Sequence, residues 1–186
     1  MRLLAGQVVA IPTDTLYGLA ALPAKPEAVD EIFRLKGRPG SKALPVLGAS
    51  IEDLESVVTF DDDAVKLARA FWPGGLTIVL PRTPSFAHDL GGGPASTVAV
   101  RVPRAEKTLQ LLDSTGPLAV TSANRSGEPA ASTAAEVGAY FGSSFPVVDG
   151  GPAGGEPSTT VTLEGGLEVL RAGAVSEEAL RQSLMS

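Results

Sequence analysis

Two polar segments each follow directly on an apolar run and carry side chains that could bind a ligand. The first is PTDTLYGL at 12–19, where hydroxyls and a carboxylate follow the run 7–12. The second is TSANRSGEP at 121–129, in which Ser122 and Asn124 can offer a hydroxyl and an amide from one turn. Polar groups that follow strands of an α/β sheet lie where such sheets bind ligands. Capped turns without a ligand are the alternative for both segments.

Cations are concentrated in one short stretch of an otherwise acidic chain. The chain has 186 residues, with 15 Lys+Arg, 21 Asp+Glu and a formal net charge of −6. Residues 34–42 contain cations and no acid: Arg34, Lys36, Arg38 and Lys42. In KGRP at 36–39 a Lys point charge and a bidentate Arg flank a Gly, which suits a phosphate or a carboxylate. A solvated helix end is the alternative, since cations there also complement the helix dipole.

One further cation lies inside an apolar segment, VAVRVP at 98–103. Burying the guanidinium of Arg101 costs free energy unless it is paired. Arg101 is therefore expected either to meet a carboxylate in the core or to point into a binding site, and the second is favoured. The Gly-rich GGG at 91–93 lacks the Lys-Ser/Thr of a Walker A loop. His88, in a polar loop, is expected at the surface.

The residue types that are missing exclude several chemistries. The chain has no Cys and one His, which excludes a disulfide, a thiol nucleophile and a Cys-ligated metal site. A Ser-His-Asp site would have to be built around His88. Hydrophobic residues make up 44% and charged residues 19% of the chain, and no apolar run approaches the ~20 residues of a membrane helix. No signal peptide is expected at the N-terminus, so the cytoplasm is the expected compartment.

The elements that must position these groups alternate only partly between strands and helices. Apolar β-branched runs predict strands, and capped segments with helical periodicity predict helices. The expected strands are 7–12, 43–47, 76–80, 97–102, 117–121, 145–149, 159–163 and 167–171. The expected helices are 27–36, 105–114, 133–141 and 177–184, a short one capped by Ser50, and one from Asp61 or Asp62 to Trp72. Because strands come in adjacent groups, the sequence predicts a mixed α/β sheet, in one domain over 1–186.

Taken together and in this order, the polar segments resemble the YrdC-like family of L-threonylcarbamoyladenylate synthases (TsaC type), in its short single-domain form. The matching stretches are PTDTLYGL at 12–19, KGRP at 36–39, PGGLT at 73–77, VAVRVP at 98–103, TSANRSGEP at 121–129, PSTTV at 157–161 and LRAG at 170–173. The ordered set is far more specific than any one motif and covers nearly the whole chain. It implies a YrdC-like fold, a twisted mixed parallel and antiparallel sheet with flanking helices and a concave cationic cavity.

The resemblance implies a nucleotidyltransferase that forms threonylcarbamoyl-AMP and pyrophosphate from L-threonine, bicarbonate or CO2, and ATP with Mg²⁺. Its product serves the formation of threonylcarbamoyladenosine (t6A) in tRNA, so the implied partners include downstream threonylcarbamoyl-transfer proteins and tRNA itself. The carbamate of threonine would be the nucleophile toward the α-phosphorus of ATP. An enzyme of this kind works by positioning and electrostatics, and it needs neither a Cys nor a second His.

The resemblance also implies the site residues, position by position. The Lys-x-Arg and Ser-x-Asn signatures are assigned to catalysis, at the ATP phosphates and the carbamate intermediate, and they comprise Lys36, Arg38, Ser122 and Asn124. The positions that match the threonine pocket are Thr15, Tyr17, Arg101 and Ser158. The positions that match further ATP contacts are Lys42, Thr97, Ala130 and Arg171.

Residues 42–47 depart from the family pattern. Many relatives carry a His after the Lys-x-Arg loop where this chain has Leu47, so a His-mediated threonine contact is not transferred. The departure leaves open a YciO-like paralogue with a different or weaker acyl-adenylate activity. A tRNA- or double-stranded-RNA-binding module is the other alternative. The net charge of −6 argues against broad RNA affinity, which depends on neutralising phosphates.

Overall fold

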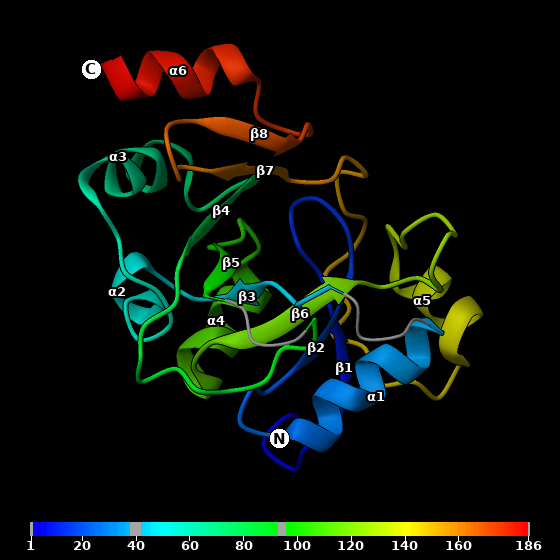
Figure 1. The fold of residues 1–186 in the computed structure, drawn as a ribbon. Coiled ribbons are helices and arrows are strands. Elements are labelled where there is room, and N and C mark those ends of the chain that lie inside the picture. Colours follow the sequence, from blue (N-terminus) through cyan, green and yellow to red (C-terminus); the bar gives the residue numbers. More distant parts are fainter. Residues whose placement is uncertain (1, 38–41, 93–95, 186) are drawn as a thin grey trace.

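One mixed sheet of eight strands forms the centre of the molecule (Figure 1). The computed structural model describes residues 2–37, 42–92 and 96–185. The strands are β1 (Val9–Ile11), β2 (Gly18–Ala21), β3 (Val46–Leu47), β4 (Leu76–Pro81), β5 (Thr97–Arg101), β6 (Leu118–Ser122), β7 (Thr159–Thr162) and β8 (Glu168–Arg171). The helices are α1 (Pro26–Lys36), α2 (Ile51–Leu54), α3 (Asp62–Phe71), α4 (Glu106–Thr115), α5 (Ala134–Phe141) and α6 (Glu177–Met185).

Parallel and antiparallel pairs occur in the same sheet, whose order is β1-β2-β6-β3-β5-β4-β7-β8. The pairs β3–β5 and β4–β7 are parallel. The pairs β1–β2, β2–β6, β3–β6, β4–β5 and β7–β8 are antiparallel. The mixed α/β fold predicted from the grouping of strands is therefore confirmed. Within the described ranges, no helix is long and apolar enough to cross a membrane.

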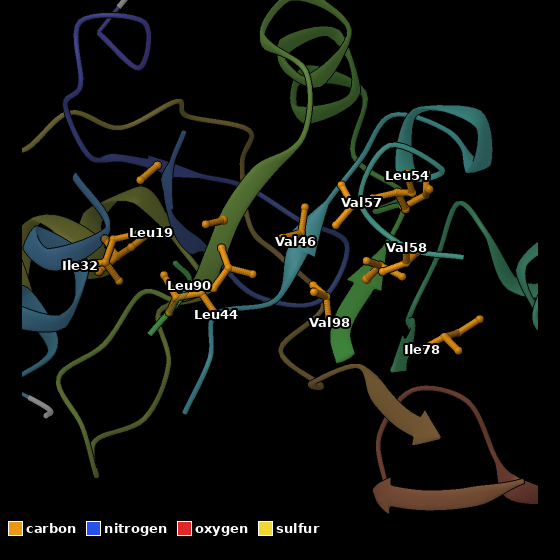
Figure 2. Packing of buried hydrophobic residues seen from close by; sticks show 14 of the residues in the cluster. Leu19, Ile32, Leu44, Val46, Leu54, Val57, Val58, Ile78, Leu90 and Val98 are labelled. Carbon is orange, nitrogen blue, oxygen red and sulfur yellow. The ribbon is translucent and has the colours of Figure 1, made fainter. Parts of the chain in front are cut away.

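Alternate residues of the strands enter two hydrophobic clusters on opposite faces of the sheet. Val46 of β3 belongs to the larger cluster and the next residue, Leu47, to the smaller one. Successive side chains of a strand point to opposite faces, which places the two clusters on the two sides of the sheet. Figure 2 shows Val46 within the larger cluster, with Leu19 and Ile32 to one side of it. Leu112 of α4 packs in the smaller cluster, so that α4 covers part of the second face.

On the face of the sheet that α4 covers, the register of the strands places several side chains next to one another. Leu47 pairs with Arg101 across β3 and β5. Thr160 of β7 pairs with Thr77 of β4 on one side and with Arg171 of β8 on the other. Residues paired in register point to the same face and lie side by side. Pairing between strands thus gathers residues that are far apart in the sequence.

The starts of α2 and α3 agree with the caps expected from the sequence. The Ser50 side chain accepts from the amide of Asp53 at 3.2 Å, and Asp61 accepts from the amide of Ala64 at 2.8 Å. Thr133 forms a reciprocal capping box with Glu136 at the start of α5.

His88 is exposed, as expected.

Two strand predictions differ from the structure. The strand predicted at 145–149 is wrong, since the structure has there an isolated bridge between Ala10 and Val147. Pro146 has no N–H to extend a ladder. Strand β2 was not predicted, because its Gly18–Ala21 sequence is rich in residues with low strand propensity. It forms because β1 and β6 supply hydrogen-bonding partners along both of its edges.

Gly173, in the Arg-x-Gly turn, packs directly against the backbone of residues 157–158. A Cβ on Gly173 would overlap the carbonyl oxygen of Pro157 and would lie 2.7 Å from the carbonyl carbon of Ser158. Because backbone atoms cannot rotate away, we expect Gly173→Ala to lower the free energy of unfolding by about 1–3 kcal/mol. Urea unfolding measures this change.

Gly138→Ala is the matched control. Gly138 lies inside α5, and a Cβ there meets nothing nearer than 3.9 Å. We expect this variant to gain about 0.5–1 kcal/mol of stability, since Ala restricts the unfolded chain more than Gly does. Equal responses of the two variants would contradict the close packing at Gly173.

Candidate functional site

A cavity of about 290 Å³ opens on the α4 face of the sheet. Its walls come from the turn after β1 and from strands β2 to β8 and their flanking residues. The lining residues are Thr13, Thr15, Leu16, Tyr17, Gly18, Pro45, Leu47, Thr77, Ala99, Arg101, Val120, Thr121, Ser122, Pro157, Ser158, Thr160 and Arg171. Hydroxyls and two guanidinium groups supply its polarity, so the cavity suits a small anionic ligand that also has an apolar part.

Arg101 is held on three sides by the protein. Its Nε donates to the carbonyl oxygen of Gly74 at 2.8 Å, its Nη1 to the Thr15 hydroxyl at 2.9 Å, and its Nη2 to Asp14 Oδ1 at 2.7 Å. The residue is 6% exposed. Burial lowers the pKa of the guanidinium and the charge of Asp14 partly offsets this, so that Arg101 stays charged at neutral pH. Arg101 therefore has both of the environments considered from the sequence: it pairs with a carboxylate, and it lines a cavity.

The hydroxyls of Thr15 and Thr13 lie next to each other in the turn after β1. The Thr13 hydroxyl donates to the carbonyl oxygen of Leu16 at 2.6 Å and lies 2.9 Å from the Thr15 hydroxyl. The Thr13 oxygen also accepts from the amides of Thr15 and Leu16, both at 3.1 Å, so its proton and both of its lone pairs are used within the turn. Since Thr15 accepts from Arg101, its oxygen keeps one lone pair that can accept from a ligand.

Arg171 is fixed by the backbone and side chain of Ser158. Its Nε and Nη2 donate to the Ser158 carbonyl oxygen at 3.1 and 2.8 Å, and Nη2 also lies 2.9 Å from Ser158 Oγ. Ser158 Oγ is in turn 2.9 Å from the Thr77 hydroxyl. Burial lowers the pKa of Arg171. The cavity therefore presents two oriented cations, Arg101 and Arg171.

The cations of segment 34–42 are placed differently from these two. Arg34 is exposed and pairs with Glu31 one turn earlier on α1. Lys36 is 4% exposed, and its Nζ donates to the carbonyl oxygens of Ser122 and Asn124 at 2.7 and 3.2 Å and to Asn124 Oδ1 at 2.9 Å. Arg38 lies outside the described residues. Lys36 thus holds the turn from which Ser122 reaches the cavity.

Ser122 and Asn124 form one unit with Lys36 behind them. The Ser122 hydroxyl donates to Asn124 Oδ1 at 2.7 Å. The Asn124 amide nitrogen donates to the carbonyl oxygens of Arg125 and Glu128 at 3.0 and 2.7 Å. The structure therefore brings Lys36, Ser122 and Asn124 together, with Ser122 lining the cavity.

Tyr17 lines the cavity, and its hydroxyl bonds to the Gly-rich segment after Asp149. The hydroxyl donates to the Gly151 carbonyl oxygen at 2.7 Å and accepts from the Gly150 amide at 3.0 Å. Burial raises the pKa of this phenol. Tyr17 consequently anchors the Gly-rich segment after Asp149 beside the threonines of the 12–15 turn.

Three of the four further ATP positions, those beyond the Lys-x-Arg and Ser-x-Asn signatures, lie outside the cavity wall. Lys42 is exposed and Thr97 is half-buried at the start of β5, and neither lines this cavity. Ala130 lines a separate cavity of about 620 Å³ with Arg125 and Tyr140. The fourth position, Arg171, lines the cavity of Arg101.

The comparisons with known proteins identify the family. A family model for Sua5/YciO/YrdC proteins, described as "Telomere recombination", matches residues 2–173. The chain belongs to this family. A Klebsiella pneumoniae protein named Threonylcarbamoyl-AMP synthase is 38% identical over 151 residues, which cover 79% of this chain and 79% of that protein.

Solved structures of the Sua5/YciO/YrdC family have the same fold. Pyrococcus abyssi Sua5 complexed with L-threonine superposes with a TM-score of 0.92 at 37% identity, over 98% of this chain and 55% of that one. The chain thus spans about half the length of the Pyrococcus protein. Escherichia coli YciO superposes with a TM-score of 0.86 at 22% identity, over 96% of this chain and 88% of that one.

Five polar residues of the site were missed from the sequence: Thr13, Asp14, Thr77, Thr121 and Thr160. Thr13 and Asp14 belong to the PTDT motif, but their roles depend on the residues with which they form hydrogen bonds. Thr77 and Thr160 reach the cavity only through strand register, for which one sequence offers no signal.

No grouping of three or more His, Cys, Asp or Glu that could hold a metal ion occurs among the described residues.

Lys36 is expected to stabilise the fold as well as the site. Replacing it by Met removes a buried ammonium that donates to the Ser122–Asn124 turn, and we expect a loss of about 1.5–3 kcal/mol of unfolding free energy. Lys66→Met is the control, because Lys66 forms an exposed pair with Asp63 at 3.9 Å and such pairs contribute about 0–1 kcal/mol. Denaturant unfolding compares them, and a Lys36→Met variant as stable as the control would refute the buried contacts.

Proposed function

We propose that this chain is a threonylcarbamoyl-AMP synthase, which forms threonylcarbamoyl-AMP and pyrophosphate from L-threonine, bicarbonate or CO2, and ATP. Support comes from the name of the Klebsiella relative and from the L-threonine complex of the Pyrococcus structure. The similarity to E. coli YciO is at lower identity and supports the fold alone, which favours the synthase over the YciO-like paralogue.

The observation that carries the proposal is the set of hydrogen-bonding groups at Arg101 and Thr15. The contacts within the described residues use three of the five guanidinium N–H groups, so Nη1 and Nη2 each keep one. Two N–H groups on the terminal nitrogens are what a carboxylate takes up. The Thr15 oxygen beside them has a lone pair that can accept, as from the N–H of an amine. An α-amino acid carries both a carboxylate and an adjacent amine.

The amino acid itself then supplies the nucleophile. The amine of threonine adds to CO2 and loses a proton to form a carbamate. A carbamate oxygen attacks the α-phosphorus of ATP, and the bond from that phosphorus to the pyrophosphate oxygen breaks. Catalysis consists of holding two anionic reactants together and stabilising the charge that develops between them. Threonine is assigned to Thr15, Arg101 and Ser158, and to the ring of Tyr17.

The ATP phosphates and the carbamate are assigned to the Lys-x-Arg and Ser-x-Asn signatures. Ser122 faces the cavity, whereas Lys36 and Asn124 hold it in place and Lys36 adds a positive charge behind it. The other members of the ATP site are Arg38, Lys42, Thr97, Ala130 and Arg171. Mg²⁺ would enter with the phosphates of ATP and keep several waters, as it usually does, and no residue is assigned to it.

We also propose the domain, the compartment and the partners of the enzyme. We assign residues 1–186 to one domain of the YrdC type, acting in the cytoplasm. The product is an activated acyl-adenylate, so proteins that transfer its threonylcarbamoyl group to tRNA are the partners that consume it. An RNA-binding module without this activity is the alternative function.

One assay separates these functions. Pyrophosphate release from ATP is measured with L-threonine and bicarbonate, and each is omitted in turn. The synthase requires both. Release with other amino acids would indicate the paralogue, and no release with salt-sensitive tRNA binding would indicate the RNA-binding module.

Arg101→Lys tests the assignment of the carboxylate site. Lysine keeps a positive charge beside Asp14 but loses the fork, so we expect kcat/KM for threonine to fall about 100-fold, as when one oriented electrostatic group is removed. Arg69→Lys is the control at an exposed position on α3. Pyrophosphate release with varied threonine measures both, and near wild-type kinetics of Arg101→Lys would remove Arg101 from the site.

A further inference from the structure

Asp14 lies directly behind Arg101 and does not line the cavity. Its Oδ1 accepts from Arg101 Nη2 at 2.7 Å and from the main-chain amide of Arg104 at 2.8 Å. The same atom therefore ties the turn after β1 both to the last residue of β5 and to the loop that follows β5. The Asp14 side chain is 21% exposed, while that of Arg101 is 7% exposed.

The turn that carries Asp14 is itself fixed on its other side. The carbonyl oxygens of Asp14 and Thr15 accept from the amides of Gly154 and Gly155 at 3.2 and 2.7 Å. A Cβ on Gly154 would lie 2.7 Å from the Asp14 carbonyl oxygen, so this approach requires a glycine. Asp14 thus acts from a backbone that neighbouring segments hold in place.

We infer that Asp14 is a positioning residue for substrate recognition, which sets the plane of the Arg101 guanidinium so that its two remaining N–H groups meet the carboxylate of the amino acid. This inference rests on the proposed function. Arg101 has a long side chain whose guanidinium can rotate about its last bonds. Gly74 holds Nε and Thr15 holds Nη1, and Asp14 holds the third nitrogen, Nη2. With all three nitrogens held, the plane is defined before substrate arrives.

The carboxylate of Asp14 also affects the electrostatics of the site. It faces the guanidinium with an opposite charge, which stabilises a cation in a place where burial alone disfavours it. Arg171 lies close enough to Arg101 to disfavour its charge further. Asp14 therefore offsets the repulsion between the buried Arg101 and the more exposed Arg171 at the same cavity.

The test compares Asp14→Ala with Asp14→Asn in the pyrophosphate-release assay. We expect Asp14→Ala to raise KM for threonine about tenfold or more, because a guanidinium held only at Nε and Nη1 can rotate away from the orientation that meets the carboxylate. The KM for ATP is expected to stay within about twofold, as for a site that does not share the altered contact. Asp14→Asn is expected to restore most of the loss, since an amide oxygen can accept from both Arg101 and Arg104.

Asp63→Ala is the matched control, because it removes a carboxylate from an exposed ion pair on α3. If Asp14→Ala does not fold, as judged by thermal melting, Asp14→Ser replaces it, since its side chain is too short to reach Nη2. An unchanged KM for threonine in the Ala or Ser variant would overturn the inference, as would equal rises in the KM values of threonine and ATP. An Asp14→Asn variant as impaired as Asp14→Ala would also overturn it.

The wild-type protein is assayed alongside these variants. Active wild-type protein with unaffected variants overturns the role of Asp14 alone. A wild-type protein without threonine-dependent pyrophosphate release overturns the proposed function and, with it, this inference.

Discussion

A buried arginine is the constraint on which the rest of the site depends. Arg101 ends a central strand with its side chain almost fully enclosed, a position that an unpaired guanidinium could occupy only at a high cost in free energy. The structure meets this cost with Asp14, Thr15 and the carbonyl oxygen of Gly74, three partners from two turns. These partners bring the turn after β1 and the turn before β4 together at one place, and the cavity forms between them.

The order of the strands explains why the cavity can be built from so many segments. β5 and β4 lie side by side, with β3 beyond one and β7 beyond the other (Figure 1). Register then places Leu47 next to Arg101, and Thr160 next to Arg171. Leu47 belongs to the core under α4 and also lines the cavity. The site is thus an extension of the hydrophobic core on that face, in which polar side chains replace apolar ones.

The sequence predicted the elements better than it predicted how they meet. The caps at Ser50 and Asp61 are local features, and both helices start there. The pairing of Gly18–Ala21 between β1 and β6 depends on distant strands, which no local pattern indicates. The charge pattern of 34–42 located cations but not their partners, since Arg34 pairs on the helix surface and Lys36 is buried under the Ser122–Asn124 turn. Such partners are determined by tertiary structure.

The hydrogen bonds of the cavity hydroxyls bear on which group acts as the nucleophile. The Thr13 proton goes to a carbonyl oxygen and the Ser122 proton to an amide oxygen, and the Thr15 hydroxyl lies beside that of Thr13. Thr77 and Ser158 bond to each other. Activating a hydroxyl as a nucleophile requires a base, such as an imidazole or a carboxylate, as its acceptor. In the hydrogen bonds of the described residues, none of these five hydroxyls has one. These contacts orient the five hydroxyls without activating them, which fits the proposed reaction, whose nucleophile is made from the amino acid.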